Sequence, residues 1–183
     1  MSLRHLMFSM GLICILLAAP FYAMAQASAP PLDYTLGSGD TITISVYDEP
    51  DLSVEARLSE SGVLSYPFIG KLKVVGLTVG ELQNSIADGL RGDYLVDPKV
   101  RVNVVEYRPF FITGEVQKPG GYTYQAGLTV EKAVSLAAGF TERANKRSIL
   151  VLSEGSHDSK PRKASLGSQI KPGDIITIEE SFF

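Results

Sequence analysis

Near its start the chain reads LGSGDTITI (residues 36–44), and near its end it reads IKPGDIITI (residues 170–178). Each stretch places a Gly-Asp pair at a tight turn, because glycine accepts positive φ and the aspartate side chain can bond nearby backbone N–H groups. Isoleucines at every second position then form one buried face of a strand. These two similar turn-then-strand units predict two small β-rich modules.

The first 25 residues have the composition of a secretion signal. Arg4 precedes the apolar run LICILLAA (residues 12–19), and AMA at residues 23–25 is the small-x-small pattern that signal peptidase reads. A transmembrane anchor is the alternative, but the run is shorter than the roughly 20 apolar residues of a spanning helix. We therefore expect a signal peptide at residues 1–25, followed by an extended leader at 26–33, where Pro30-Pro31 blocks a helix.

Cysteine content and charge narrow the classes of function. Cys14 is the only cysteine and lies inside the signal after the bulky Ile13, so we expect an exported chain without a lipid anchor, disulfide or thiolate site. Removal of the signal takes away one basic residue, which changes the formal net charge from −3 to −4. This charge disfavours nucleic acid as a partner.

Residues 34–108 are expected to form the first module. Strands are predicted at 41–47 and 72–75, and two further runs between 56 and 66 are interpreted as a hairpin joined at Glu60-Ser61-Gly62. Thr78 and Glu81 have the spacing of a capping box and predict a helix that ends near residues 89–92. A last strand follows Asp97-Pro98, with valines alternating from residue 100 to 104.

Residues 109–183 are expected to form the second module. A strand at 110–116 and a turn at 117–121 lead to a short segment at 122–124 and a helix that opens with GLTV (127–130), as the first helix does at 76–79. A strand pair at 148–152 and 163–166 and a final strand at 174–179 complete it. The predicted class is α+β, with two small mixed β modules that each contain one main helix, the second module being a β-grasp.

Side chains for catalysis are sparse. His157 is the only histidine after the signal, and it lies in a polar loop without a positioned nucleophile and acid. The carboxylates of Asp48-Glu49-Pro50-Asp51 could serve a glycosidic bond or Ca²⁺, but their spacing is that of a solvated turn. We therefore expect no enzyme, no cofactor and no metal site. A secreted hydrolase acting through Asp48, Glu49 or His157 is a third class of function, and it would require cleavage of a polysaccharide.

Aromatic side chains are candidates for sugar contacts, since sugar rings stack on exposed aromatic faces. Most of them are interpreted as core or interface residues: Tyr66, Tyr94, Tyr107, Phe110 and Phe111. Tyr122 and Tyr124 are separated by two positions and so share one face of a strand. This pair is the preferred candidate for contact with a saccharide.

Several motifs, taken in order, resemble the bacterial outer-membrane polysaccharide export family. Its export domain is similar to YxLGxGDxIxIxV (34–46), GxLxxPxxG (62–70), GxT (76–78) and the step at Asp97-Pro98. Its soluble-ligand-binding β-grasp (SLBB) domain is similar to GEVxxPGxY (114–122), the Thr129 helix and Ala144-Asn145. The resemblance implies structural roles for Gly37, Gly39, Asp40, Pro67, Gly70, Gly76, Thr78, Pro98, Gly114, Val116, Pro119 and Gly120.

The resemblance implies a non-enzymatic component of a capsule or exopolysaccharide export machine. Its subunits are expected to form a homo-oligomeric ring in the periplasm, associated with the outer membrane, that conducts the polysaccharide outward. An inner-membrane copolymerase or chain-length protein is the expected partner. The alternative is a periplasmic sensor that binds a soluble sugar or ligand without forming a conduit.

This sequence departs from the family's pattern in four ways. The second helix ends Ala137-Ala138-Gly139 where the family commonly has Ala-Gly-Gly. No lipidated cysteine follows the signal, no amphipathic helix follows Glu180, and one β-grasp module is present. We expect a short member whose outer-membrane pore is supplied by a separate protein.

Overall fold

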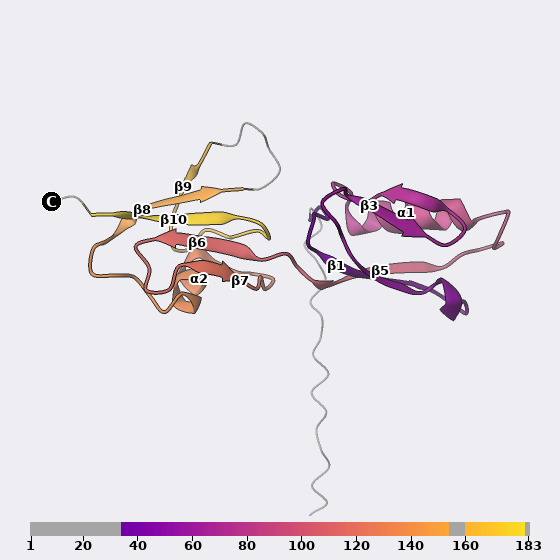
Figure 1. Ribbon diagram of the computed structural model, residues 1–183, viewed down its shortest axis with the longest axis horizontal. Coiled ribbons are helices and arrows are strands. Elements are labelled where there is room, and N and C mark those ends of the chain that lie inside the picture. The colour runs from indigo at the N-terminus through magenta and orange to yellow at the C-terminus, as the bar shows by residue number, and fades with distance from the viewer. Residues whose placement is uncertain (1–33, 154–159, 182–183) are drawn as a thin grey trace, which may run out of the picture.

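The computed structural model describes residues 34–153 and 160–181 of the 183-residue chain. The expected signal peptide and leader (1–33), His157 and the C-terminal Phe182-Phe183 lie outside the described residues. The described elements surround two hydrophobic cores, one before Tyr107 and one after it, which we call the N-terminal and C-terminal modules (Figure 1). Within residues 34–153 and 160–181, no helix is long and apolar enough to cross a membrane.

The N-terminal module is built on a three-stranded antiparallel sheet. Its strands lie in the spatial order β2 (Val54–Arg57), β1 (Thr41–Val46) and β5 (Val100–Glu106), and the 3-10 helix η1 (Pro50–Leu52) connects β1 to β2. Ile42 and Ile44 of β1 are fully buried and lie opposite valines of β5. The alternating apolar pattern of the sequence therefore forms the inner face of this sheet.

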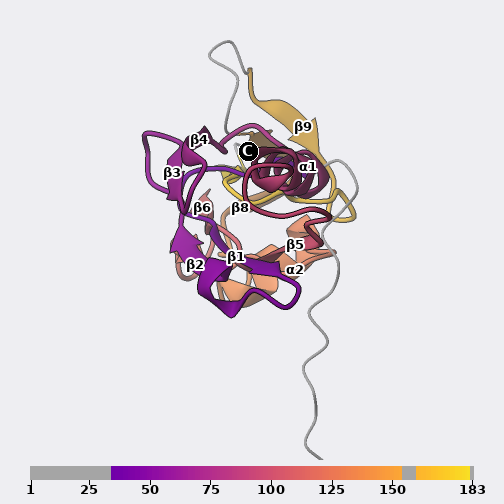
Figure 2. The same cartoon turned by 90° about the vertical axis from the view of Figure 1, so that its right-hand side faces the viewer.

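A helix and a hairpin cover that inner face. Figures 1 and 2 show α1 (Val79–Leu90) and the antiparallel pair β3 (Val63–Tyr66) and β4 (Gly70–Lys73) on the same side of the sheet. The helix buries Leu82, Ile86 and Leu90 at spacings of four residues. The core of the module thus lies between the sheet and one stripe of α1.

The predicted capping box of α1 is confirmed. The hydroxyl of Thr78 accepts a hydrogen bond from the backbone N–H of Glu81 at 3.2 Å, and the Glu81 carboxylate accepts one from the backbone N–H of Thr78 at 2.8 Å. These bonds satisfy N–H groups that the first turn of a helix leaves without a partner. The hydrogen bonds that the Glu81 carboxylate accepts from the backbone N–H and then from the hydroxyl of Thr78 hold the pKa of this carboxyl below its ordinary value.

The hairpin predicted between residues 56 and 66 is wrong. β2 pairs with β1 and β3 pairs with β4, so the two runs belong to different sheets. Gly62 lies between them with φ of +69°, and its carbonyl accepts hydrogen bonds from Val74 and Val75. The chain therefore turns from one layer to the other, because both runs reach the same core from opposite sides.

The C-terminal module is a five-stranded mixed sheet with one helix. Its strands lie in the order β7 (Gly120–Tyr122), β6 (Phe110–Gly114), β10 (Ile175–Glu180), β8 (Ala144–Leu152) and β9 (Arg162–Ala164). The central strand β10 pairs in parallel with β6 and antiparallel with β8. The helix α2 (Val130–Leu136) buries Val130, Ala133 and Val134 against one face. This arrangement confirms the predicted α+β class with a β-grasp-like second module.

The end of α2 contains a residue in the left-handed region. The backbone N–H of Gly139 donates to the carbonyl of Val134 and that of Ala138 donates to Ser135, as in a Schellman motif. Ala138 has φ of +64°, a conformation that glycine adopts more easily than alanine. The departure from the family's Ala-Gly-Gly therefore retains the turn but places a Cβ in it.

Substitution of Ala138 by glycine should stabilise the protein. Relief of the left-handed conformation outweighs the greater freedom of glycine in the unfolded chain, so Ala138→Gly should raise the free energy of unfolding by about 0.5–1 kcal/mol. Urea denaturation followed by circular dichroism measures the change. The matched control Ala133→Gly, inside the helix, should lower it by at least about 1 kcal/mol, because it also removes a buried methyl group. A loss of stability in Ala138→Gly would contradict the argument.

Candidate functional site at the junction of the modules

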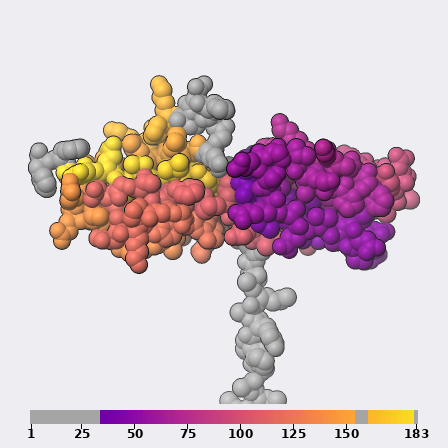
Figure 3. Space-filling model, viewed as in Figure 1, coloured from indigo at the N-terminus to yellow at the C-terminus, as the bar shows by residue number. Residues whose placement is uncertain are grey.

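Three residues, Tyr107, Arg108 and Pro109, connect β5 to β6. The Tyr107 ring packs against both hydrophobic cores. It contacts Tyr34 edge-to-face with centroids 5.1 Å apart, and Tyr124 in the same way at 5.3 Å. Figure 3 shows that the surfaces of the two modules meet here. The link is therefore a packed junction that includes side chains from both modules.

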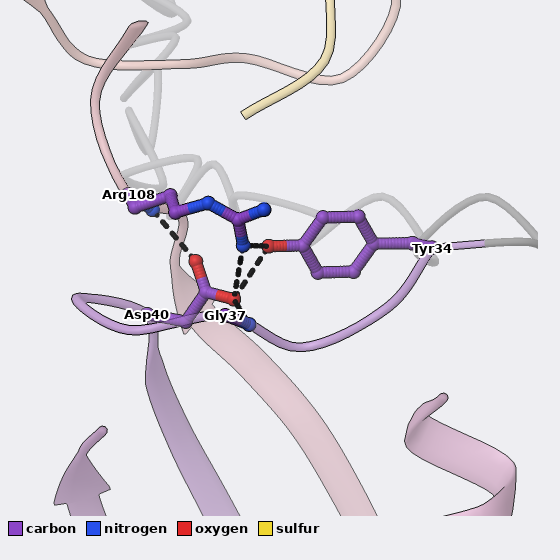
Figure 4. A network of polar contacts seen from close by, with 4 residues as sticks. All are labelled: Tyr34, Gly37, Asp40 and Arg108. Carbon is purple, nitrogen blue, oxygen red and sulfur yellow. Dashed lines mark hydrogen bonds and ion pairs between the residues drawn. The ribbon is translucent and has the colours of Figure 1, made fainter. Parts of the chain in front are cut away.

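The carboxylate of Asp40 is the polar centre of this junction (Figure 4). Asp40 is 0% exposed, and its Oδ2 accepts hydrogen bonds from the Tyr34 hydroxyl at 2.5 Å and the Gly37 backbone at 2.8 Å. Arg108 donates its backbone N–H to Oδ1 at 2.8 Å and its Nη1 to Oδ2 at 3.1 Å. A buried carboxylate with this many donors and an opposite charge is well compensated.

The contacts within this cluster also change the pKa of Tyr34. Burial of the phenol, and then its hydrogen bond to the Asp40 carboxylate, raise the pKa of Tyr34 far above the ordinary tyrosine value. Arg108 also donates from Nη1 to the Tyr34 hydroxyl at 3.0 Å, which works in the opposite direction. Tyr34 therefore stays a neutral hydrogen-bond donor throughout the physiological range. The arrangement positions these groups and does not resemble acid–base machinery.

Glycine is required beside this cluster. A Cβ built on Gly37 would lie 2.1 Å from Nη1 of Arg108, so any side chain at this position would displace the guanidinium. Gly39 has φ of +92°, in the region that favours glycine. The Gly-x-Gly-Asp motif thus serves two purposes, a left-handed turn and an open place for the arginine.

The second turn-then-strand unit repeats the geometry of the first. Asp174 is 1% exposed, and its Oδ2 accepts from the backbone N–H of Lys171 at 3.0 Å, three residues earlier, as Oδ2 of Asp40 does from Gly37. Its Oδ1, like the Tyr107 hydroxyl, has no hydrogen-bond partner among residues 34–153 and 160–181. Burial raises the pKa of Tyr124. A backbone hydrogen bond at Gly127 lowers this pKa in part, and the negative charge of Asp174 raises it further. Two buried aspartates therefore stand at the two ends of a row of three tyrosines.

The other motif residues support turns, caps and close approaches. Gly76 donates to the carbonyl of Leu36, and a Cβ on Gly114 would lie 2.0 Å from the carbonyl oxygen of Ile178. Pro98 and Val116 are buried. The remaining members lie at turns, at strand starts and at the cap of α1: Pro67, Gly70, Pro119, Gly120 and Thr78.

The structure does not bring the predicted sugar-contact pair together on an open face. Strand β7 ends at Tyr122, so the two-residue period does not continue to Tyr124. Tyr124 is 7% exposed and packs on Tyr107, while Tyr122 is half-buried, stacks on Phe110 and donates its hydroxyl to the Lys118 carbonyl at 2.6 Å. A role in sugar binding remains a prediction for this pair, and Tyr124 has little ring surface to offer.

Sequence reasoning missed the aromatic rings that are most exposed within the part of the chain that the structure describes. Tyr47 is 71% exposed and Phe68 is 63% exposed, and Tyr94, interpreted as a core or interface residue, is 48% exposed with its ring 4.8 Å from that of Phe68. The signal for Tyr47 was present, because it follows the alternating pattern of β1 at an outward position. Phe68 gave no such signal, since its exposure depends on a left-handed backbone with φ of +63°.

The residues considered for catalysis are not assembled into a site. Asp48, Glu49 and Asp51 lie around the turn from β1 into η1, and His157 is outside the described residues. Among residues 34–153 and 160–181, no group of three histidine, cysteine or acidic side chains has a geometry that could hold a metal ion.

Removal of the Asp40 charge should destabilise the protein strongly. Asp40→Asn removes a buried carboxylate that accepts four hydrogen bonds, one of them from the largely buried guanidinium of Arg108, and we expect a loss of about 3–5 kcal/mol in the free energy of unfolding. Urea denaturation measures the loss. Asp88→Asn is the matched control, because Asp88 pairs with Arg91 at 2.6 Å on the exposed surface, and such pairs contribute at most about 1 kcal/mol. Similar losses in the two variants would contradict this account of the junction.

Alkaline pH should unfold the protein through its buried tyrosines. The pKa of Tyr34 is higher in the folded state than the ordinary value of about 10, so above pH 10 the unfolded state binds fewer protons than the folded state. The free energy of unfolding should therefore be constant with respect to this group below pH 10 and fall above it, by up to about 1.4 kcal/mol per pH unit. Denaturation between pH 8 and about pH 11 should give a shallower decline in Tyr34→Phe. Identical slopes in the two proteins would refute the prediction.

Comparison with known proteins gives two family matches. Residues 28–105 match the family model described as polysaccharide biosynthesis/export protein, and residues 109–158 match the SLBB domain. The first match contains the Asp40 cluster except for Arg108, and the second begins at Pro109, directly after that arginine.

Curated relatives have names that agree with these matches. The exopolysaccharide production protein ExoF of Rhizobium meliloti (strain 1021) is 35% identical over 141 residues, which cover 70% of this chain and 32% of the relative. The EPS I polysaccharide export outer membrane protein EpsA of Ralstonia nicotianae is 26% identical over 188 residues, 84% of this chain and 49% of the relative. EpsA of Ralstonia solanacearum is 24% identical over 188 residues, which cover 84% of this chain and 50% of the relative.

This chain thus spans between about a third and a half of the length of the curated relatives it matches. The two family matches follow one another in the order that the motifs indicated. They confirm the resemblance found in the sequence and place this chain in the polysaccharide biosynthesis/export family, with an SLBB domain after its export domain.

Proposed function

We propose that this chain is a component of a machine that exports a capsular polysaccharide or exopolysaccharide across the bacterial envelope, as part of the conduit for the polymer. The observation that carries the proposal is the pair of matched domains, polysaccharide biosynthesis/export at 28–105 and SLBB at 109–158. Relatives named for exopolysaccharide production and for polysaccharide export support the same function.

The protein acts by shape and association and not by catalysis. The residues of the family motifs that could carry chemistry are used for structure, since Asp40 is buried among four donors and Thr78 caps a helix. The other motif positions are glycines, prolines and a buried valine. A conduit needs a shaped and hydrated wall, for which a rigid packed junction is suitable.

Identical subunits assemble side by side into a ring that docks on an inner-membrane polysaccharide copolymerase or chain-length protein. The support in this chain is its open strand edges, at β2 and β5 in the N-terminal module and at β7 and β9 in the C-terminal module. The unpaired backbone groups of edge strands can pair with another chain. The copolymerase is the partner that the family resemblance implies.

The chain is exported by its signal peptide and works in the periplasm, associated with the outer membrane. Support comes from the composition of residues 1–25 and from the relatives named as outer membrane export proteins. Its two domains are residues 34–108 and 109–183, with the boundary between Arg108 and Pro109.

Deletion of the gene tests the function. We expect surface polysaccharide to disappear while its lipid-linked precursor is still made, because export is blocked after synthesis. Extraction and quantification of both pools measures this, and a plasmid copy of the gene should restore the surface polymer.

A deletion strain that retains normal surface polymer would refute the export function. Loss of the precursor as well would indicate a role in synthesis. A polymer level that stops responding to an added soluble sugar, with export intact, would favour the sensor alternative.

A further inference from the structure

A cleft of about 240 Å³ lies at the end of the N-terminal module that is far from the junction. One wall is the turn after β1, with Tyr47, Asp48 and Glu49, and the other is the loop before β5, from Leu95 to Lys99. Figure 1 shows these segments where β1 ends and β5 begins. Pockets for drug-sized ligands have volumes of about 300–1,000 Å³, so this cleft suits a smaller unit such as one sugar ring.

The two walls are held together by the sheet itself. The backbone N–H of Tyr47 donates to the carbonyl of Lys99 at 3.0 Å, directly after the paired residues Val46 and Val100. Leu95 donates its N–H to the carbonyl of Leu90 at 2.9 Å, which fixes the loop to the end of α1. Pro98 is a buried residue that lines the cleft. The cleft is therefore formed before any ligand arrives, which lowers the entropic cost of binding.

The ring of Tyr47 is the feature of this cleft that indicates a ligand class. Tyr47 is 71% exposed, more than Phe68, Tyr94 or Phe111, although tyrosine rings ordinarily bury much of their surface. A pyranose ring has an apolar face of C–H groups that packs on an aromatic face and a rim of hydroxyl groups. The exposed ring of Tyr47, at the edge of the cleft, matches the apolar face of the sugar.

The polar side chains of the cleft match the second feature of a pyranose, its rim of hydroxyl groups. The carboxylates of Asp48, Glu49 and Asp97 are acceptors for sugar hydroxyl groups, and the ammonium group of Lys99 is a donor. Three negative charges and one positive charge line the cleft, so its field repels a uronate and favours a neutral sugar. Leu95 and Val96 add apolar surface to the lining of the cleft.

We propose that this cleft is a saccharide-binding site that holds one neutral pyranose ring of the exported polymer against the ring of Tyr47. The proposal rests on the export function, because a polysaccharide in transit supplies the ligand. Binding at each subunit is weak, since a conduit must release what it binds at every step. Repetition of the site around an oligomer retains the polymer through multivalency while single contacts exchange.

Nuclear magnetic resonance spectroscopy of the protein without its expected signal peptide tests the site. The probes are hexasaccharides of glucose, mannose and galactose, with a galacturonate hexamer as the charged comparison. We expect at least one neutral hexasaccharide to shift the amide signals of residues 47–49 and 95–99, and the galacturonate hexamer to bind at least tenfold more weakly. Failure of all three neutral probes to shift these signals at millimolar concentration, or equal binding of the galacturonate, overturns the proposal.

Matched variants assign the effect to the Tyr47 ring. Tyr47→Ala should weaken binding about tenfold, and Tyr47→Phe, which keeps the aromatic face, should stay within about twofold. Phe111→Ala is the control, because Phe111 is 44% exposed on β6 of the other module. Both positions are exposed, so the three variants should keep the fold, which their spectra verify. Unchanged binding in Tyr47→Ala, or an equal loss in Phe111→Ala, overturns the assignment.

Failure of this site and failure of the export function can be distinguished. If gene deletion abolishes surface polymer but none of the neutral hexasaccharides binds, export stands and the cleft is not its sugar site. If the deletion strain makes normal surface polymer while Tyr47-dependent binding is observed, the export function fails and the protein is a sugar-binding module.

Discussion

Burial of the Asp40 carboxylate is the constraint on which the arrangement of the modules depends. Its donors come from three places: Tyr34 before the sheet, Gly37 in the turn, and Arg108 in the link to the next module. A buried carboxylate that loses its partners costs several kcal/mol, so these groups must be in place together. The path by which the chain leaves the N-terminal module is therefore fixed by the same charge that closes its first turn.

Local patterns in the sequence were sufficient for much of this fold. The capping box at Thr78 and the alternating apolar residues of β1 and β5 depend on neighbours within a few positions, and both were predicted correctly. The pairing of β2 and β3 with other strands was not, because it is decided by which layer completes the core. The partnership of Asp40 with Arg108 spans 68 positions and leaves no local signal, although the Gly-x-Gly-Asp motif marked one half of it.

The aromatic residues also show that local patterns miss contacts between residues distant in sequence. A period of two placed Tyr122 and Tyr124 on one face, but the strand ends at Tyr122 and the chain then turns Tyr124 into the core. The outward position of Tyr47 follows from the alternation of β1, but the loop of residues 95–99 that forms the opposite wall of its cleft is distant in sequence. Short patterns can place a ring on one face of a strand, and they do not contain what the rest of the chain packs beside it.

The central position of β10 determines when the C-terminal module can fold. Without residues 175–180 the five-stranded sheet separates into two isolated hairpins, β6 with β7 and β8 with β9, which are marginally stable in water at best. Folding of this module must therefore wait until residues 175–180 are available to pair with both hairpins. The module is therefore a single cooperative unit, in which truncation before residue 175 removes the parallel and the antiparallel pairing of β10 at once.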